Sequence, residues 1–353
     1  MTDRIRDIVQ VLEENNIDAL LVSKQENVRY FSGFTGDSTV LFIMPDAQYL
    51  ITDARYTEQA EQEAPAYTVI THSGMFWEGL LPLWKDRQRQ VLGYERTEIS
   101  HALYCNLEEQ LQPEKMVGVA LDGLRMIKSS EEISYLETAC QIADEAFAEL
   151  LPEIRPGVTE RYLQGYLEWN MLKRGAEEKS FDTIVASGRR SSLPHGTATD
   201  KQIEKGDFIT FDFGAVYKGY HSDITRTVVV GQPTEEQKQL YDRVLHAQCL
   251  GVESVRPGLS GKDVDQIVRQ YFKEQSCDEY FIHSLGHGIG LEIHELPVLS
   301  PKSTAILASG MVVTVEPGLY IPNFGGVRIE DSVLVTEKGC RILTKTTKEL
   351  LVL

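Results

Sequence analysis

The chain has 353 residues, of which 42% are hydrophobic and 25% are charged. This length favours two domains, and the composition is that of an ordinary globular protein rather than a disordered or fibrous one. Thirty-five Lys and Arg against 53 Asp and Glu leave a net charge of −18, and no basic stripe interrupts the acidic excess, so we expect no nucleic-acid partner.

No segment reaches membrane-spanning length, and the N-terminal stretch contains no apolar run of signal-peptide length. The five cysteines are widely spaced and form no CxxC pair, which argues against a disulfide framework. We therefore expect a cytoplasmic protein with reduced thiols and no membrane partner.

The first 125 residues alternate short apolar runs with polar helical stretches, a pattern typical of an α/β domain. The apolar runs lie at 19–22, 39–44, 49–52 and 117–121. Beyond them, Ser129 or Ser130 offers a helix cap before an apolar stripe at helical spacing. We predict an N-terminal α/β domain over 1–125 and a second domain over 126–353.

The second part contains a weak internal repeat. Arg155-Pro156-Gly157 recurs as Arg256-Pro257-Gly258, 101 residues later. Each copy follows a helical pattern and precedes a capping hydroxyl, Thr159 or Ser260, and a second apolar stripe. This order predicts a duplicated pair of helices, and with it two pseudo-symmetric halves that enclose a cleft.

Two apolar stretches of the second part form a predicted hairpin that carries two acids. The stretch 208–214 contains Asp212, and the stretch 222–230 begins with Ser222-Asp223. Counting outward from a turn centred near residues 217–218 sets Asp223 opposite or nearly opposite Asp212.

A second acidic pair arises in the same way, because 312–316 and 326–330 flank a turn centred on Asn323 that sets Glu316 opposite Glu330. Such acids could lie on a solvent-facing side, but these strands are strongly apolar. Like charges across a ladder are destabilising, and burying them costs more, so the two pairs together demand a cation. Two divalent ions would balance four carboxylates, and a hydroxide bridging the ions could act as the nucleophile.

A histidine-rich stretch follows the repeat. His283, His287 and His294 fall within twelve residues, and glycines flank His287, so that backbone can approach closely there. A lone histidine is more often structural, but three beside a predicted acidic cleft favour a ligand. We predict that His287 joins the carboxylates.

The motifs around these residues resemble those of a known family. They read Ser-Leu-Gly-His-Gly-Ile-Gly, Val-Glu-Pro-Gly-Leu-Tyr and Gly-Gly-Val-Arg-Ile-Glu-Asp. With the two aspartates, they resemble the pita-bread metallopeptidases, in the proline-specific branch that contains aminopeptidase P and prolidase. The resemblance is specific over 126–353, whereas 1–125 is similar to the creatinase-type domain of that branch only in size and α/β pattern. It implies an α/β creatinase-type domain followed by an α+β pita-bread catalytic domain with pseudo-twofold internal duplication.

The resemblance also implies a role for each predicted ligand. Asp212 would bind one metal ion, and Asp223 and Glu330 would bridge two ions. His287 and Glu316 would complete the second site, and Glu316 would also shuttle the proton of the attacking water.

Further residues are implied on the substrate side. His195 and His294 match histidines that contact the leaving proline nitrogen and the tetrahedral oxyanion. His283 and Arg328 match further positions in the pocket, and strand alternation independently places Arg328 on the face of Glu330.

The expected function is hydrolysis of the Xaa-Pro bond of a dipeptide or small peptide with a penultimate proline, which releases the first residue. The expected cofactor is two divalent ions, with manganese favoured over cobalt or zinc because the ligands are mostly oxygen. The resemblance further implies a homodimer or larger assembly.

Three alternatives can be weighed from the sequence. Methionine aminopeptidases share the ligands but generally lack an N-terminal domain of this size. Creatinase, a metal-free hydrolase of the same architecture, does not keep the metal-binding set, and binding modules of this fold have lost it. The intact ligand set argues against these last two alternatives.

Overall fold

The structure is a computed structural model that describes residues 3–85 and 90–353. The chain divides into two units, Met1–Arg125 and Met126–Leu353. Within the described ranges, no helix combines the length and the apolar character needed to cross a membrane.

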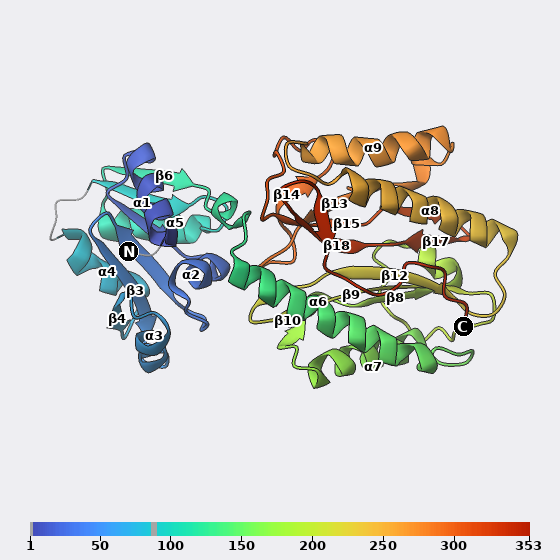
Figure 1. The fold of residues 1–353 in the computed structure, drawn as a ribbon. Coiled ribbons are helices and arrows are strands. Elements are labelled where there is room, and N and C mark those ends of the chain that lie inside the picture. The colour runs from blue at the N-terminus through green and yellow to red at the C-terminus, as the bar shows by residue number, and fades with distance from the viewer. Residues whose placement is uncertain (1–2, 86–89) are drawn as a thin grey trace. The chain divides into compact units, whose positions relative to one another are not determined.

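The first unit is built on a mixed six-stranded sheet in the order β4-β3-β2-β1-β5-β6 (Figure 1). Its strands are β1 (Ala19–Val22), β2 (Val40–Met44), β3 (Ala47–Asp53), β4 (Thr68–His72), β5 (Val91–Glu95) and β6 (Lys115–Val119). Its helices are α1 (Asp3–Asn15), α2 (Gln25–Ser32), α3 (Thr57–Glu63), α4 (Phe76–Lys85), α5 (His101–Leu111) and the 3-10 turn η1 (Asp122–Arg125). Strands β1 and β2 are buried along their whole length, as expected where helices cover a sheet. The predicted α/β architecture is confirmed.

Two helix pairs frame the second unit. They are α6 (Ser130–Leu150) with α7 (Glu160–Lys173), and α8 (Glu235–Ser254) with α9 (Gly261–Glu274). Gly157 and Gly258 adopt nearly the same left-handed φ, 92° and 90°, and Thr159 and Ser260 cap the helices that follow. The predicted internal duplication is confirmed in the order helix, turn, cap, helix.

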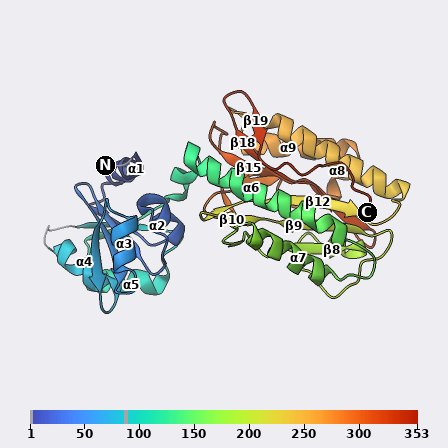
Figure 2. The same cartoon turned by 60° about the horizontal axis from the view of Figure 1, so that its bottom comes forward.

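The strands of this unit lie between the two helix pairs, with α6 and α7 on one side and α8 and α9 on the other (Figures 1 and 2). The first half contributes β7 (Glu178–Lys179), β8 (Ile184–Ser187), β9 (Phe208–Phe213), β10 (Ala215–Tyr217), β11 (Tyr220–His221) and β12 (Ile224–Val229). The second half contributes β13 (Gly286–Gly288), β14 (Glu295–Leu299), β15 (Val312–Val315), β16 (Gly318–Ile321), β17 (Gly325–Arg328), β18 (Asp331–Val335) and β19 (Cys340–Ile342). Short 3-10 turns complete the unit: η2 (Leu151–Glu153), η3 (Gly188–Ser192) and η4 (Asp278–Tyr280). The sheet orders are β12-β9-β8 and β14-β13-β15-β18-β19, with smaller sheets β11-β10-β7 and β16-β17.

Alternation along β9 separates two hydrophobic cores. Ile209, Phe211 and Phe213 belong to the core of α6 and α7, where the Phe213 ring stacks on Phe147 with centroids 5.3 Å apart. Phe208 belongs to the core of α8 and α9. The acid on β9 therefore lies on a strand that both cores hold in place.

The hairpin after β9 turns at Lys218 and Gly219. Both residues have positive φ, 51° and 73°, as in a type I′ turn, and Tyr217 pairs with Tyr220. Asp212 therefore lies opposite Thr225 rather than Asp223, so the predicted turn centre is wrong by one residue.

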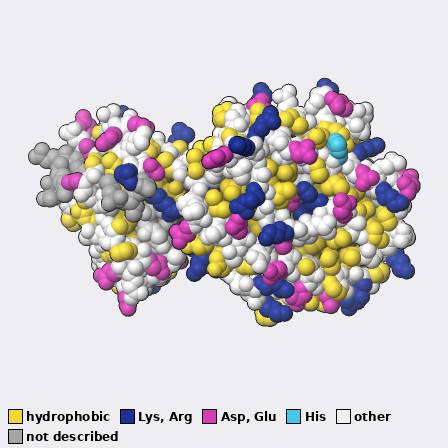
Figure 3. Space-filling model, viewed as in Figure 1, with side chains coloured by type: hydrophobic (Ala, Val, Ile, Leu, Met, Phe, Trp, Pro, Cys, Tyr) yellow, Lys and Arg dark blue, Asp and Glu magenta, His cyan; other side chains and the backbone are white. Residues whose placement is uncertain are grey.

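Charged side chains of both signs are interspersed over the face drawn in Figure 3. On that face the acidic excess of the sequence is distributed among basic side chains rather than gathered into one patch.

Candidate metal centre

The predicted ligands converge between the two halves of the second unit. Carboxylate oxygens of Asp212, Asp223 and Glu330 lie within 4.8 Å of one another. His287 Nε2 lies 3.5 Å from Asp223 Oδ2 and 3.4 Å from Glu316 Oε1. All five side chains thus meet at one place, although they come from segments far apart in the sequence.

The second acidic pair lies at a break between two ladders. Val315 pairs with Asp331 and Gly318 with Arg328, so the register predicted about Asn323 is confirmed. The backbones of Glu316 and Glu330 make other contacts: Glu316 N donates to Leu285 O at 2.9 Å, and Glu330 N donates to Thr225 O at 3.1 Å. The break takes both residues out of a regular ladder, and their backbone N–H groups bond to neighbouring segments instead.

Three carboxylate oxygens at the centre have no protein partner. Asp212 Oδ1, Asp223 Oδ1 and Glu330 Oε1 are buried without a hydrogen bond among the described residues. A buried acceptor left unsatisfied costs about 1–3 kcal/mol, more when it is charged. Hard oxygen donors with one imidazole nitrogen are a set that divalent cations accept. The residues present therefore fit a site for divalent metal ions.

Burial shifts the protonation of these groups. It raises the pKa of Glu316 to about 8, although the positive charge of Arg328 opposes the shift. Burial, followed by the charges of neighbouring carboxylates, raises the pKa of Asp223 and Glu330 well above the usual range. Burial lowers the pKa of His287 to about 4, so its imidazole is neutral at pH 7 and available as a ligand. A cation would relieve the crowding of the carboxylates.

Arg328 and two hydroxyl groups orient the acids. Arg328 Nη2 donates to Asp212 Oδ2 at 2.6 Å, and its Nη1 donates to Tyr320 OH at 2.7 Å. Thr225 Oγ1 donates to Glu330 Oε2 at 2.7 Å and accepts from Arg328 Nε at 3.1 Å. Thr225 and Tyr320 are not among the residues predicted from the motifs. Strand alternation places Thr225, two positions after Asp223, on the face of that acid, but only the fold brings Glu330, 105 residues away, to its hydroxyl.

The predicted substrate-side residues differ in how directly they contact this centre. The rings of His287 and His294 have centroids 4.3 Å apart, and His283 Nε2 lies 2.9 Å from Tyr320 OH. His195 is exposed and follows Pro194, whose carbonyl oxygen accepts from Arg328 Nη1 at 3.2 Å.

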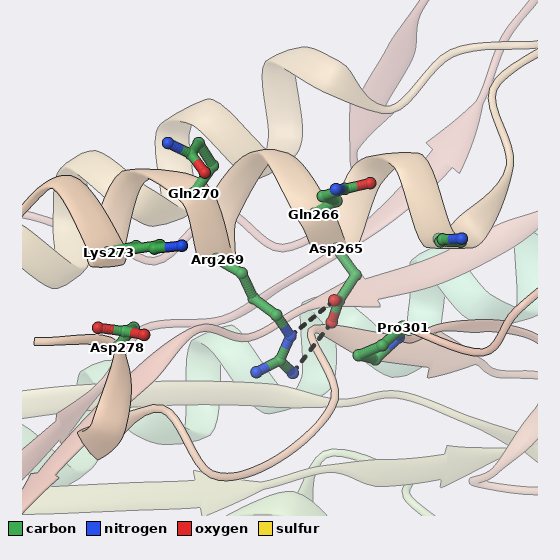
Figure 4. A pocket seen from close by; sticks show the side chains of 8 residues that line it. Asp265, Gln266, Arg269, Gln270, Lys273, Asp278 and Pro301 are labelled. Carbon is green, nitrogen blue, oxygen red and sulfur yellow. Dashed lines mark hydrogen bonds and ion pairs between the residues drawn. The ribbon is translucent and has the colours of Figure 1, made fainter.

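A pocket beside α9 contains none of the predicted ligands (Figure 4). In it Arg269 Nε donates to Asp265 Oδ2 at 2.7 Å, and Arg269 Nη2 donates to His283 O at 2.5 Å. Arg269 therefore connects the wall of this pocket to the backbone of the segment that carries His283.

Comparisons with known proteins agree with this geometry. Residues 134–337 match the model of metallopeptidase family M24, and residues 4–127 match the creatinase/prolidase N-terminal domain. An Xaa-Pro dipeptidase of Pyrococcus furiosus is 43% identical, over 99% of this chain and 100% of the relative.

Solved structures agree as well. An Xaa-Pro dipeptidase from Bacillus anthracis has a TM-score of 0.97 at 45% identity, over 99% of each chain. An X-Pro aminopeptidase from Thermotoga maritima has a TM-score of 0.91 at 39% identity, over 100% of each chain. The resemblance and the fold class predicted from the motifs are confirmed. The chain belongs to metallopeptidase family M24, whose members use divalent metal ions, and it carries a creatinase/prolidase N-terminal domain ahead of a pita-bread catalytic domain.

Proposed function

We propose that this protein is an Xaa-Pro peptidase that hydrolyses the bond before proline in dipeptides and releases the first residue. The observation that carries the proposal is the set of three buried, unpartnered carboxylate oxygens beside His287. The relatives named Xaa-Pro dipeptidase supply the substrate class, since they match this chain over nearly its whole length.

Two divalent ions would be held by Asp212, Asp223, His287, Glu316 and Glu330. When bound, such ions lower the pKa of a water molecule and polarise a carbonyl group. Manganese is the ion we favour over cobalt or zinc, because four of the five ligands are carboxylates.

Glu316 is the proposed proton carrier. Its carboxylate accepts a proton from the attacking water and delivers it toward the leaving nitrogen. Thr314 Oγ1 donates to Glu316 Oε1 at 3.3 Å and also accepts from His287 N at 3.1 Å. Thr314 thereby fixes the carboxylate of Glu316 relative to the backbone of His287.

His294 and His195 are the proposed substrate contacts. Burial lowers the pKa of His294, so the imidazole is neutral at pH 7 and can donate an N–H hydrogen bond to a developing oxyanion. An Xaa-Pro bond has no N–H, so a site for it must supply a proton to the proline nitrogen as this group leaves. The proton is the one that Glu316 carries, and His195, on the opposite half of the unit, is the candidate for a hydrogen-bond contact with that nitrogen.

A panel of peptides tests the proposal directly. Purified, manganese-loaded protein is expected to cleave Ala-Pro and Gly-Pro dipeptides, with slower cleavage of Ala-Pro-Ala and no turnover of Met-Ala peptides or creatine. Equal rates on Ala-Pro and Ala-Ala would refute the proline preference. Turnover of creatine alone would assign the chain a creatinase-like reaction instead.

Two further proposals concern the assembly and the location of the chain. We propose a homodimer or larger assembly, which the resemblance in the motifs implies, and a mass of 39.8 kDa in light scattering over a wide range of concentration would contradict it. A cytoplasmic location is supported by five free cysteines, of which Cys140 and Cys277 are buried. Cell fractionation checks that location.

A further inference from the structure

Residues 187–199 form the segment that carries His195. The segment begins at the end of β8, passes through η3 and contains a turn in which Gly196 N donates to Leu193 O at 3.0 Å. Thr197 forms an isolated antiparallel bridge with Ile184, and the remaining residues of the segment have no regular structure, so many of their backbone groups need partners outside a ladder.

One buried carboxylate binds both ends of this segment. Glu160, the first residue of α7, is fully buried. Its Oε1 accepts from Ser187 N and Ser187 Oγ, both at 2.8 Å. Its Oε2 accepts from Thr199 N at 3.0 Å and from Thr199 Oγ1 at 2.7 Å. Each oxygen thus holds one end of the segment.

Arg190, within the same segment, balances the charge of Glu160. Arg190 Nε lies 3.1 Å from Glu160 Oε2, and Arg190 Nη2 donates to Thr197 O at 2.6 Å. A buried carboxylate with four hydrogen bonds and a paired guanidinium is fully satisfied, so it fixes the geometry of the groups around it. Here those groups are the two ends of the segment and the turn next to His195.

We propose that Glu160 is a positioning residue, which holds the segment 187–199 closed so that His195 faces the metal centre. The inference rests on the proposed function for the role of His195. The segment already touches the centre, because Pro194 O accepts from Arg328, whose guanidinium also binds Asp212. Loss of the anchor at either end would displace His195, whereas Arg328 would keep its bonds to Asp212, Tyr320 and Thr225.

The test is Glu160→Gln, made in the wild type and in a His195→Ala background. The glutamine side chain replaces one carboxylate oxygen with an NH2 group, which cannot accept hydrogen bonds from the N–H and O–H donors at one end of the segment. That end is therefore released. We expect kcat on Ala-Pro to fall by about tenfold or more in the wild type, since small displacements of catalytic groups cost this much. In the His195→Ala background the fall should be less than about twofold, because the anchor acts through His195. An equal fall in both backgrounds would overturn the proposal.

Hydrogen exchange supplies a readout that needs no turnover. Backbone amides of the segment 187–199 are expected to exchange faster in Glu160→Gln, with or without metal, while the amides of β9 keep the wild-type rate. Unchanged exchange in the segment would overturn the proposal. If the wild-type protein failed to cleave Xaa-Pro, the proposed function would fall, and the exchange measurement would still decide whether Glu160 anchors the segment.

Two more variants complete the design. Asp200→Asn is the matched control, because it breaks an exposed pair at the same helix start, Arg161 Nε to Asp200 Oδ1 at 2.9 Å, and should leave kcat and exchange unchanged. Thr199→Val removes one hydroxyl, which donates to Glu160 Oε2 at 2.7 Å and accepts from Lys201 N at 3.2 Å, and this variant serves if Glu160→Gln does not fold. It should give a smaller loss with the same dependence on His195, and a loss that ignores His195 would overturn the proposal.

Discussion

Arg328 Nη2 donates to one oxygen of Asp212 at 2.6 Å, while the other oxygen of the same carboxylate is buried without a hydrogen-bond partner in the part of the chain that the structure describes. The guanidinium is almost wholly buried, with 4% of its side chain exposed, and three further hydrogen bonds fix it in place. One carboxylate oxygen of Asp212 is therefore held by Arg328, and the other oxygen remains available to a ligand.

Glu330→Gln should reduce metal binding. The substitution removes one negative charge from the ligand set, which includes the three unpartnered carboxylate oxygens. The affinity for metal ions should therefore fall about 10- to 100-fold or more. Metal analysis after dialysis is expected to find about two ions per wild-type chain and fewer in the variant. Glu337→Gln, an exposed acid in the same part of the chain, is the control. Fewer than one ion in the wild type would contradict a binuclear centre.

Glu316→Gln should lower turnover of Ala-Pro by more than about 100-fold, because it removes the charge of a ligand and the proton carrier together. The fold should survive, since burial raises the pKa of Glu316 to about 8 and the neutral glutamine resembles the protonated side chain of the metal-free protein. Steady-state kinetics and circular dichroism measure the two effects. A rate like that of the wild type would remove Glu316 from the mechanism.

His294→Ala should lower kcat by roughly 100-fold, because the lost hydrogen-bond donor acts on the developing oxyanion. The accompanying rise in KM should be much smaller. Metal content should stay at the wild-type value, which separates this residue from the ligands. His246→Ala, which removes a histidine that packs against Tyr271 on the outer helix pair, is the control. A rise in KM alone would assign His294 to substrate binding.

His283 should make stability depend on pH in acid. Burial, followed by the charge of Arg328, lowers the pKa of His283 to about 4 from 6.5. Between pH 6.5 and pH 4 the imidazole of His283 is protonated in the unfolded chain but neutral in the folded chain. The free energy of unfolding therefore has its full value above pH 6.5 and decreases as the pH falls toward 4. Chemical unfolding of chelator-treated wild type and His283→Asn should show the wild type losing stability relative to the variant as pH falls from 6.5 to 4. A constant difference would contradict the assignment.

Local patterns predict much of this fold. The apolar run Ala19–Val22 and the polar stretch Thr57–Glu63 are a strand and a helix with those bounds. Ser129 forms a capping box with Glu132, as the acidic residue three positions after a cap predicts. Periodicity and capping depend on neighbours in sequence, and these elements need no further information.

The register of the first hairpin shows where such patterns fail. The residues most typical of a type I′ turn are Asn-Gly and Asp-Gly, and here the turn is Lys218-Gly219, with the lysine in a left-handed conformation. A lysine gives no signal for that conformation. Because Asp212 and Asp223 meet through side chains rather than as a ladder pair, the error in register did not separate them.

The residues that position the ligands and the substrate contacts were harder to predict than the ligands themselves. The acids and His287 stand out because charged residues interrupt apolar strands. Glu160 and Thr225 act on groups far away in the sequence, and each alone resembles an ordinary helix-start acid or strand threonine. Only the fold brings them to their partners.

The ligand set also bears on how the catalytic unit holds together. Asp212 and Asp223 belong to the half framed by α6 and α7, whereas His287, Glu316 and Glu330 belong to the half framed by α8 and α9. A cation bound by both groups acts as a reversible cross-link, because it binds only when the halves are joined, and its binding free energy adds to their cohesion. The centre that would perform the chemistry would thus also hold the two halves of the duplicated unit together.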